Sequence, residues 1–238
     1  MRFIYNAPAI IYKRTLIIGD THFGMERKLE RKGIHAGDFS EKLFSKIKKL
    51  IIKHKIIRLI FLGDIKDDIT TCDEKTKDII SKLQLLADVI IIRGNHDGGI
   101  EHTGAQIIDS GGFVYGNLGL AHGHAWPSEK LLQCDYLVIA HSHPMASFED
   151  KLGKRHTEPV WIFANPIPDN ISKHYKKFNK KIKLIVMPAF NPLVGYPLDS
   201  YGKKSFGPIF DNKLFKLDDA LLFKLNGISL GTLEKLGV

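Results

Sequence analysis

The strongest constraint on the fold is a set of short, nearly continuous apolar runs at Leu16–Ile18, Ile56–Leu62 and Val89–Ile92. Runs of this length without polar alternation are typical of strands that are buried on both faces. Between these runs, Phe39–His54 and Glu74–Leu86 repeat apolar residues at helical spacing. Strands that alternate with helices in this way predict an α/β fold with a central parallel sheet.

The rest of the chain predicts a second sheet. Phe113–Ala121 and Tyr136–Ala140 are predicted as strands, and shorter strands joined by Pro, Gly and Asn-rich turns are expected at Val160–Phe163, Ile182–Met187, Leu214–Leu217 and Leu221–Leu225, with a turn at Asn226-Gly227. We expect two mixed β-sheets packed as a sandwich flanked by helices. Residues 1–238 would form a single domain, in which residues 196–238 extend the second sheet.

Composition indicates the expected location of the protein more clearly than its function. No apolar run reaches the roughly 18 residues needed to span a bilayer, and the first residues do not resemble a signal peptide. The two cysteines, Cys72 and Cys134, are too few for a disulfide framework, so a cytoplasmic protein with reduced thiols and no membrane partner is expected. The net charge of +9 fits a polyanionic partner such as nucleic acid, and equally fits a lysine-rich solubilising surface.

Groups of polar residues follow the predicted strands. They are Asp20-Thr21-His22, Gly63-Asp64, Gly94-Asn95-His96-Asp97, His122-Gly123-His124 and His141-Ser142-His143. Open α/β sheets bind their ligands at the carboxyl ends of strands, so we expect these groups to meet at one edge.

Each group alone is weak evidence, because Gly-Asp is also an ordinary turn in which Asp caps a helix. Together they predict a metal centre. Imidazole, amide and carboxylate ligands without thiolate suit Mn²⁺, Fe or Zn²⁺. A site for two cations roughly 3.5–4 Å apart needs a bridging anion, and Asp64 is the natural candidate.

These motifs resemble the calcineurin-like metallophosphoesterase superfamily, whose pattern is D-x-H, G-D, G-N-H-D/E, H and G-H-x-H in that order. The matching residues are Asp20, His22, Asp64, Asn95, His96, Asp97, His122, His141 and His143. Asp20–Glu26 and Pro188–Gly195 further resemble an archaeal ICC-like group, which is related to phosphoesterases found beside bacterial DNA ligases. Ala140 stands where the family usually has a glycine.

The resemblance implies a role for each matching residue. Asp20, His22 and His143 would bind one divalent metal ion, Asn95, His122 and His141 would bind a second, and Asp64 would bridge them. Manganese is expected first, with iron, zinc, nickel and cobalt as alternatives. His96 would contact the phosphate and assist the leaving oxygen, and Asp97 would orient His96. His124 is expected at the rim of the site.

The expected reaction is attack on a phosphate ester, and a phosphodiester in particular, by a hydroxide bridging the two ions. Lys173–Lys183 interleaves lysines with Tyr175 and Phe178, which suits nucleic-acid binding, although a solvated loop is the favoured interpretation. A non-catalytic interaction scaffold and a DNA-repair nuclease are the alternative functions. The sequence does not indicate an oligomeric state.

Overall fold

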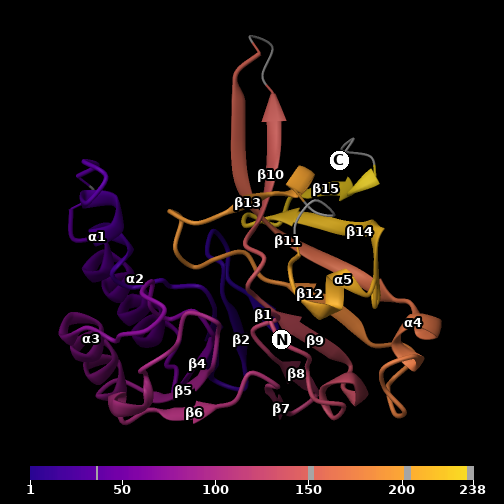
Figure 1. Cartoon of the computed structure of the whole chain (residues 1–238), viewed down its shortest axis with the longest axis horizontal. Helices are drawn as coiled ribbons and strands as arrows, with labels where there is room; N and C mark the ends of the chain where they lie inside the picture. Colours follow the sequence, from indigo (N-terminus) through magenta and orange to yellow (C-terminus); the bar gives the residue numbers. More distant parts are fainter. Residues whose placement is uncertain (36, 150–152, 201–204, 235–238) are drawn as a thin grey trace.

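The computed structural model describes residues 1–35, 37–149, 153–200 and 205–234 and consists of two mixed β-sheets packed face to face with helices outside them (Figure 1). The predicted fold class is therefore confirmed. No helix in these described ranges is long and apolar enough to cross a membrane.

The first sheet has the strand order β1-β2-β3-β4-β5-β6, and β3, β4, β5 and β6 run parallel. Its strands are β1 (Arg2–Phe3), β2 (Ile10–Tyr12), β3 (Thr15–Ile18), β4 (Arg58–Leu62), β5 (Asp88–Ile92) and β6 (Gln106–Ile108). The three apolar runs identified in the sequence are β3, β4 and β5.

Two helices, α2 (Phe39–Lys53) and α3 (Glu74–Gln84), cover the outer face of this sheet, and the short helix α1 (Met25–Glu30) packs against α2 (Figure 1). Asp38 caps α2 and Asp73 caps α3, each by accepting a hydrogen bond from the backbone N–H three residues later. The apolar stripes of α2 and α3 pack on Leu16, Leu59 and Ile91, whereas Ile17, Ile60 and Ile90 face the second sheet. These strands are therefore buried on both faces, as their composition predicts.

The second sheet has the order β13-β10-β11-β12-β9-β8-β7, with β14 paired to β11 and β15 paired to β14. Its strands are β7 (Phe113–Tyr115), β8 (Leu118–Leu120), β9 (Tyr136–Ile139), β10 (Pro144–Glu149), β11 (Arg155–Pro166), β12 (Lys183–Val186), β13 (Tyr196–Pro197), β14 (Phe215–Lys224) and β15 (Ser229–Thr232). Two short helices, α4 (Pro168–Ser172) and α5 (Pro208–Asp211), pack on its outer face, and 3-10 turns occur at Glu101–Thr103, Leu131–Gln133 and Leu198–Ser200.

Strand boundaries in the second sheet differ from the predicted ones. Phe113–Ala121 is a hairpin of β7 and β8, because Gly116 has a φ of 64° and turns the chain. The two predicted strands at Leu214–Leu217 and Leu221–Leu225 are one strand, β14, which follows β11 through a shift of register after Phe163. β10 was not predicted, and with the first part of β11 it forms a two-stranded arm that projects from the sandwich (Figure 1).

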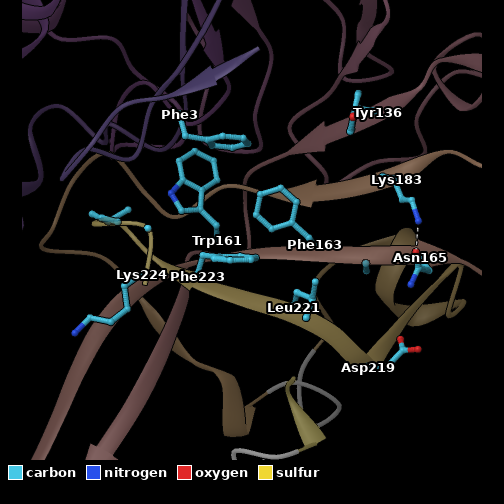
Figure 2. A pocket seen from close by; sticks show the side chains of 13 residues that line it. Phe3, Tyr136, Trp161, Phe163, Asn165, Lys183, Asp219, Leu221, Phe223 and Lys224 are labelled. Carbon is cyan, nitrogen blue, oxygen red and sulfur yellow. Dashed lines mark hydrogen bonds between the residues drawn. The ribbon is translucent and has the colours of Figure 1, made fainter. Parts of the chain in front are cut away.

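The second sheet is wider than the first, which leaves a cavity of about 530 Å³ at one end of the sandwich. Its wall is aromatic, with Phe3 of β1 packed edge to face on Trp161 and Phe163 of β11 (Figure 2). Lys183 and Asn165 are hydrogen-bonded to each other at its border. The candidate metal ligands contribute nothing to this cavity.

Candidate metal centre

The loops that carry the candidate ligands begin where strands of both sheets end. Asp20 and His22 follow β3, Asp64 follows β4 and Asn95 follows β5, while His122 follows β8 and His141 and His143 follow β9. Since β3, β4 and β5 are parallel to one another and β8 is parallel to β9, each set of loops leaves its sheet at one edge. The two sets meet, because Asp20 contacts both His122 and His143.

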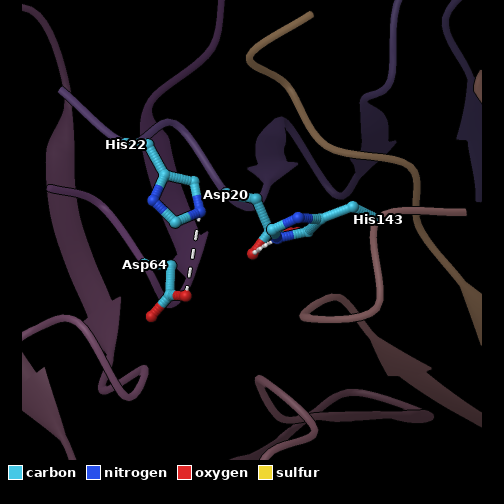
Figure 3. Close-up of side chains that lie close together, drawn as sticks. All are labelled: Asp20, His22, Asp64 and His143. Carbon is cyan, nitrogen blue, oxygen red and sulfur yellow. Dashed lines mark ion pairs between the residues drawn. The ribbon is translucent and has the colours of Figure 1, made fainter. Parts of the chain in front are cut away.

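One group of ligand atoms comes from four buried side chains, Asp20, His22, Asp64 and His143 (Figure 3). One nitrogen or oxygen from each lies within 4.8 Å of all the others. His143 Nε2 lies 3.1 Å from Asp20 Oδ1, and His22 Nε2 lies 3.8 Å from Asp64 Oδ2. Four donors converging on one volume can hold a divalent cation.

A second group shares Asp64 and adds His122 and His141. His122 Nε2 lies 3.4 Å from Asp64 Oδ1 and 3.2 Å from both His141 Nδ1 and Asn95 Oδ1. The opposite ring nitrogen, His122 Nδ1, lies 2.6 Å from the carbonyl of Leu62, to which it donates a hydrogen bond. This bond orients the ring and directs Nε2 toward the group.

Several buried polar atoms of the first group have no hydrogen-bond partner. They include both ring nitrogens of His22 and Nδ1 of His143, while Asp20 Oδ1 and His143 Nε2 are paired with each other at 3.1 Å. Buried polar groups are normally satisfied, and a set of unsatisfied donors and acceptors in one place calls for an explanation such as an ion. The donor set and its burial therefore fit a bound divalent metal.

The backbone is strained at the same positions. Asp20, His22, Asp64, His141 and His143 have φ between 42° and 65°, and they are five of the ten non-glycine residues with positive φ in the described chain. L-amino acids rarely adopt this conformation, and such strain concentrates at functional sites. The strain aims side chains from three different loops, those after β3, β4 and β9, into one small volume.

Burial and charge set different protonation states within the centre. Burial opposes the charged form of His122, but the carboxylates of Asp64 and Asp20 outweigh it and raise the pKa of His122 to about 9. Burial lowers the pKa of His22 to about 4, and burial together with the charge of His122 lowers that of His141 to about 3. Burial alone would raise the pKa of Asp64, but His122 and His22 hold it well below its ordinary value. At neutral pH the carboxylates are thus ionised, and His22 and His141 are neutral and ready to bind a cation.

His96 lies beside the centre, with its ring centroid 5.1 Å from that of His22. His96 Nδ1 lies 2.6 Å from the carbonyl oxygen of Asp67, to which it donates a hydrogen bond. This bond fixes the proton on Nδ1 and leaves Nε2 for another partner.

Asp97 was expected to orient His96, and the hydrogen bonds of its carboxylate run to the backbone and not to the His96 ring. The buried Asp97 carboxylate instead accepts hydrogen bonds from the backbone N–H groups of Asp64, Ile65 and Gly94, at 2.7–2.9 Å. Its oxygens are occupied by these amides, so Asp97 joins the loop after β4 to the loop after β5. Burial, followed by the nearby charge of Asp64, raises the pKa of Asp97.

Two residues that the sequence analysis overlooked support this region. Asp67 Oδ1 lies 3.7 Å from His22 Nδ1, and Asp67 with His22 and His96 forms a third convergent group. The sequence signal for Asp67 was its position three residues after Asp64. Lys66 is almost completely buried, and its ammonium group donates to the carbonyls of His96 and Asp68. Lys66 and Asp97 therefore both tie the loop after β4 to the loop after β5.

His124 lies closer to the centre than a rim position suggests. Its ring centroid is 5.1 Å from that of His122 and 5.9 Å from that of His141, and its buried Nδ1 has no hydrogen-bond partner. Burial lowers the pKa of His124 to about 4, with His122 adding to the effect.

Comparison with known proteins shows the family and the fold of the chain. The profile of the calcineurin-like phosphoesterase family matches residues 13–213. The nuclease MPE of Pseudomonas putida has a similar fold, with a TM-score of 0.57 and 18% identity over 94% of this chain and 92% of that one. A Vps29 mutant from Entamoeba histolytica also matches, with 18% identity over 77% and 80% of the two chains, but its TM-score is only 0.34.

Proposed function

Because the chain belongs to the calcineurin-like phosphoesterase family, we propose that it hydrolyses phosphodiesters at a centre that holds two divalent metal ions. The observation that carries the proposal is the pair of convergent groups that share Asp64. Asp20, His22, Asp64 and His143 would hold one ion, and Asp64, Asn95, His122 and His141 the other. A carboxylate common to both groups would screen the two cations from each other.

Bound divalent ions would supply a nucleophile from water at neutral pH and stabilise the charge that develops on the phosphoryl oxygens. Manganese is the ion we propose first, because oxygen and imidazole donors without thiolate suit it. The described cysteines, Cys72 and Cys134, are buried free thiols away from both groups.

His96 is the proposed catalytic side chain. Its Nδ1–H is held by the Asp67 carbonyl, which leaves Nε2 for the substrate, and its ring lies beside that of His22. As an imidazolium, His96 would bind a phosphoryl oxygen and give its Nε2 proton to the leaving alkoxide. Asp97 and Lys66 would act only by holding the two loops in place.

A diester is proposed over a monoester because the chain carries a net charge of +9. Polyanions such as nucleic acids are attracted by an excess of this size. The similarly folded Pseudomonas putida protein is described as a nuclease, which makes nucleic acid the first substrate to test. The intact ligand set favours catalysis over a non-catalytic scaffold.

The test is a metal-reconstituted activity screen. Chelated protein is supplied with Mn²⁺, Ni²⁺, Co²⁺ or Zn²⁺ and assayed with bis-p-nitrophenyl phosphate, p-nitrophenyl phosphate, cyclic nucleotides and DNA. We expect metal-dependent hydrolysis that favours the diester. His143→Ala should abolish it, whereas His102→Ala, which removes an exposed histidine outside both groups, should not. Absence of hydrolysis with every metal would favour the scaffold function.

A further inference from the structure

An exposed basic loop follows α4, and it is defined here as residues 173–181. It contains five lysines and no acidic residue, and Lys173, Lys176, Lys177, Lys180 and Lys181 are all exposed. None of the five forms an ion pair with a carboxylate of the described residues; Lys173 is hydrogen-bonded to the neutral side chain of Asn170. Their charge is therefore available to an outside partner.

The loop is held in a defined conformation by its own aromatic residues. Tyr175 is buried and donates a hydrogen bond to the carbonyl of Pro127, and Phe178 packs on the core beneath the second sheet. The Glu129 carboxylate accepts hydrogen bonds from the backbone N–H groups of Lys176 and Lys177. Tyr175 is thus unavailable for base stacking and Phe178 is partly covered, while the lysines between them stay exposed.

Two other rings are exposed, that of His174 within the basic loop and that of Trp126 against it. Trp126 is 43% exposed, and its ring lies on that of the exposed His174, with centroids 4.6 Å apart and an interplanar angle of 35°. Trp126 also contacts Tyr175 edge to face. An exposed tryptophan supported in this way offers an apolar surface next to the lysine-rich loop that carries His174 and Tyr175.

The rings are close to the metal centre along the chain. Trp126 follows His122 by four residues, so the two Cα atoms are separated by no more than roughly 14 Å. Trp126 is therefore close enough to the centre for one nucleic-acid strand to reach both.

We infer that Trp126, His174 and the lysines of the basic loop form a binding surface for single-stranded nucleic acid. Bases stack on exposed aromatic rings regardless of sequence, and lysines neutralise the phosphates. A duplex would hide its bases from Trp126. The surface lies outside both metal-binding groups and binds whether or not the centre is loaded, so the inference goes beyond the proposed hydrolysis.

Binding is measured by fluorescence anisotropy of a fluorescein-labelled oligo(dT) of 20 nucleotides, in EDTA so that no hydrolysis occurs. Trp126→Ala should weaken binding about tenfold, the loss expected for one stacked base. Lys176→Glu with Lys177→Glu should weaken it at least as much. Replacing the same two lysines by glutamine should make the negative slope of log binding constant against log salt concentration shallower by about 1.4, since two phosphate contacts are lost.

The matched control is Lys48→Glu with Lys49→Glu on α2, which changes the net charge equally at exposed positions on the other sheet. It should change binding by less than twofold, and circular dichroism of each variant checks the fold. Equal weakening by both lysine pairs, no effect of Trp126→Ala, or tighter binding of duplex than of single strand would overturn the inference. So would binding to phosphatidylserine vesicles without binding to oligo(dT). Nucleic-acid binding without hydrolysis of any ester would instead refute only the proposed function.

Discussion

At the scale of single residues, His96 is proposed to act in catalysis, whereas its neighbours are proposed to bind metal. The His96 ring contacts the carbonyl of Asp67 and lies beside His22, but it belongs to neither of the groups that share Asp64. We expect His96→Ala to lower turnover by roughly 10²–10⁴-fold, the usual contribution of a general acid, while metal content stays near that of the wild type. Activity and elemental analysis of the same preparation measure both. Loss of the metal would show that His96 is a ligand and contradict its proposed role.

His122 should make metal affinity depend on pH. Its pKa of about 9 means that the free protein carries a proton on this imidazole at pH 7, and a metal ion must displace that proton. Affinity should therefore rise by about tenfold per pH unit from pH 7 to 9 and level off above the pKa. Calorimetry in buffers of different ionisation enthalpy would detect the released proton. An affinity independent of pH over this range would mean that His122 is neutral before the metal binds.

At the scale of elements, the turns after β4 and β5 depend on a close contact between Gly94 and Asp64. A methyl group on Gly94 would lie 2.2 Å from Asp64 Oδ1 and 2.3 Å from the Asp64 nitrogen, so the two loops would have to separate. Gly94→Ala should cost about 1–3 kcal/mol of stability and weaken metal binding. Gly111→Ala is the control, because its added methyl group meets nothing closer than 3.9 Å. Thermal melts with and without metal test this, and equal behaviour of the two variants would contradict it.

At the scale of the whole molecule, the two sheets share one apolar layer. Ile17, Ile60 and Ile90 of the first sheet pack on Val138 and Ile185 of the second. Residues 1–238 as one domain remain our proposal, and it predicts a single cooperative unfolding transition. Metal at 100 times its Kd should raise the free energy of unfolding by about 2.7 kcal/mol. Two separate transitions, or a stable fragment of one sheet after limited proteolysis, would show that the sheets fold independently.

The sequence by itself predicted the features that depend on neighbouring residues. Alternation of buried strands and amphipathic helices identified the first sheet, since periodicity is local. The order of short motifs at strand ends identified the family and the residues proposed as ligands, because each motif lies within a few residues of its strand. The narrower resemblance to an archaeal group remains a prediction.

Only the tertiary structure decided the contacts between segments that are distant in the chain. Asp97 binds the amides of Asp64 and Ile65, more than 30 residues away, and no local pattern distinguishes that role from a contact with His96. Tyr175 lies in the core and Trp126 at the surface, and the neighbouring sequence does not indicate which of the two is buried. Burial depends on what packs on each side chain, and Tyr175 is covered by the apolar cluster on the outer face of the second sheet, which residues distant in the chain build.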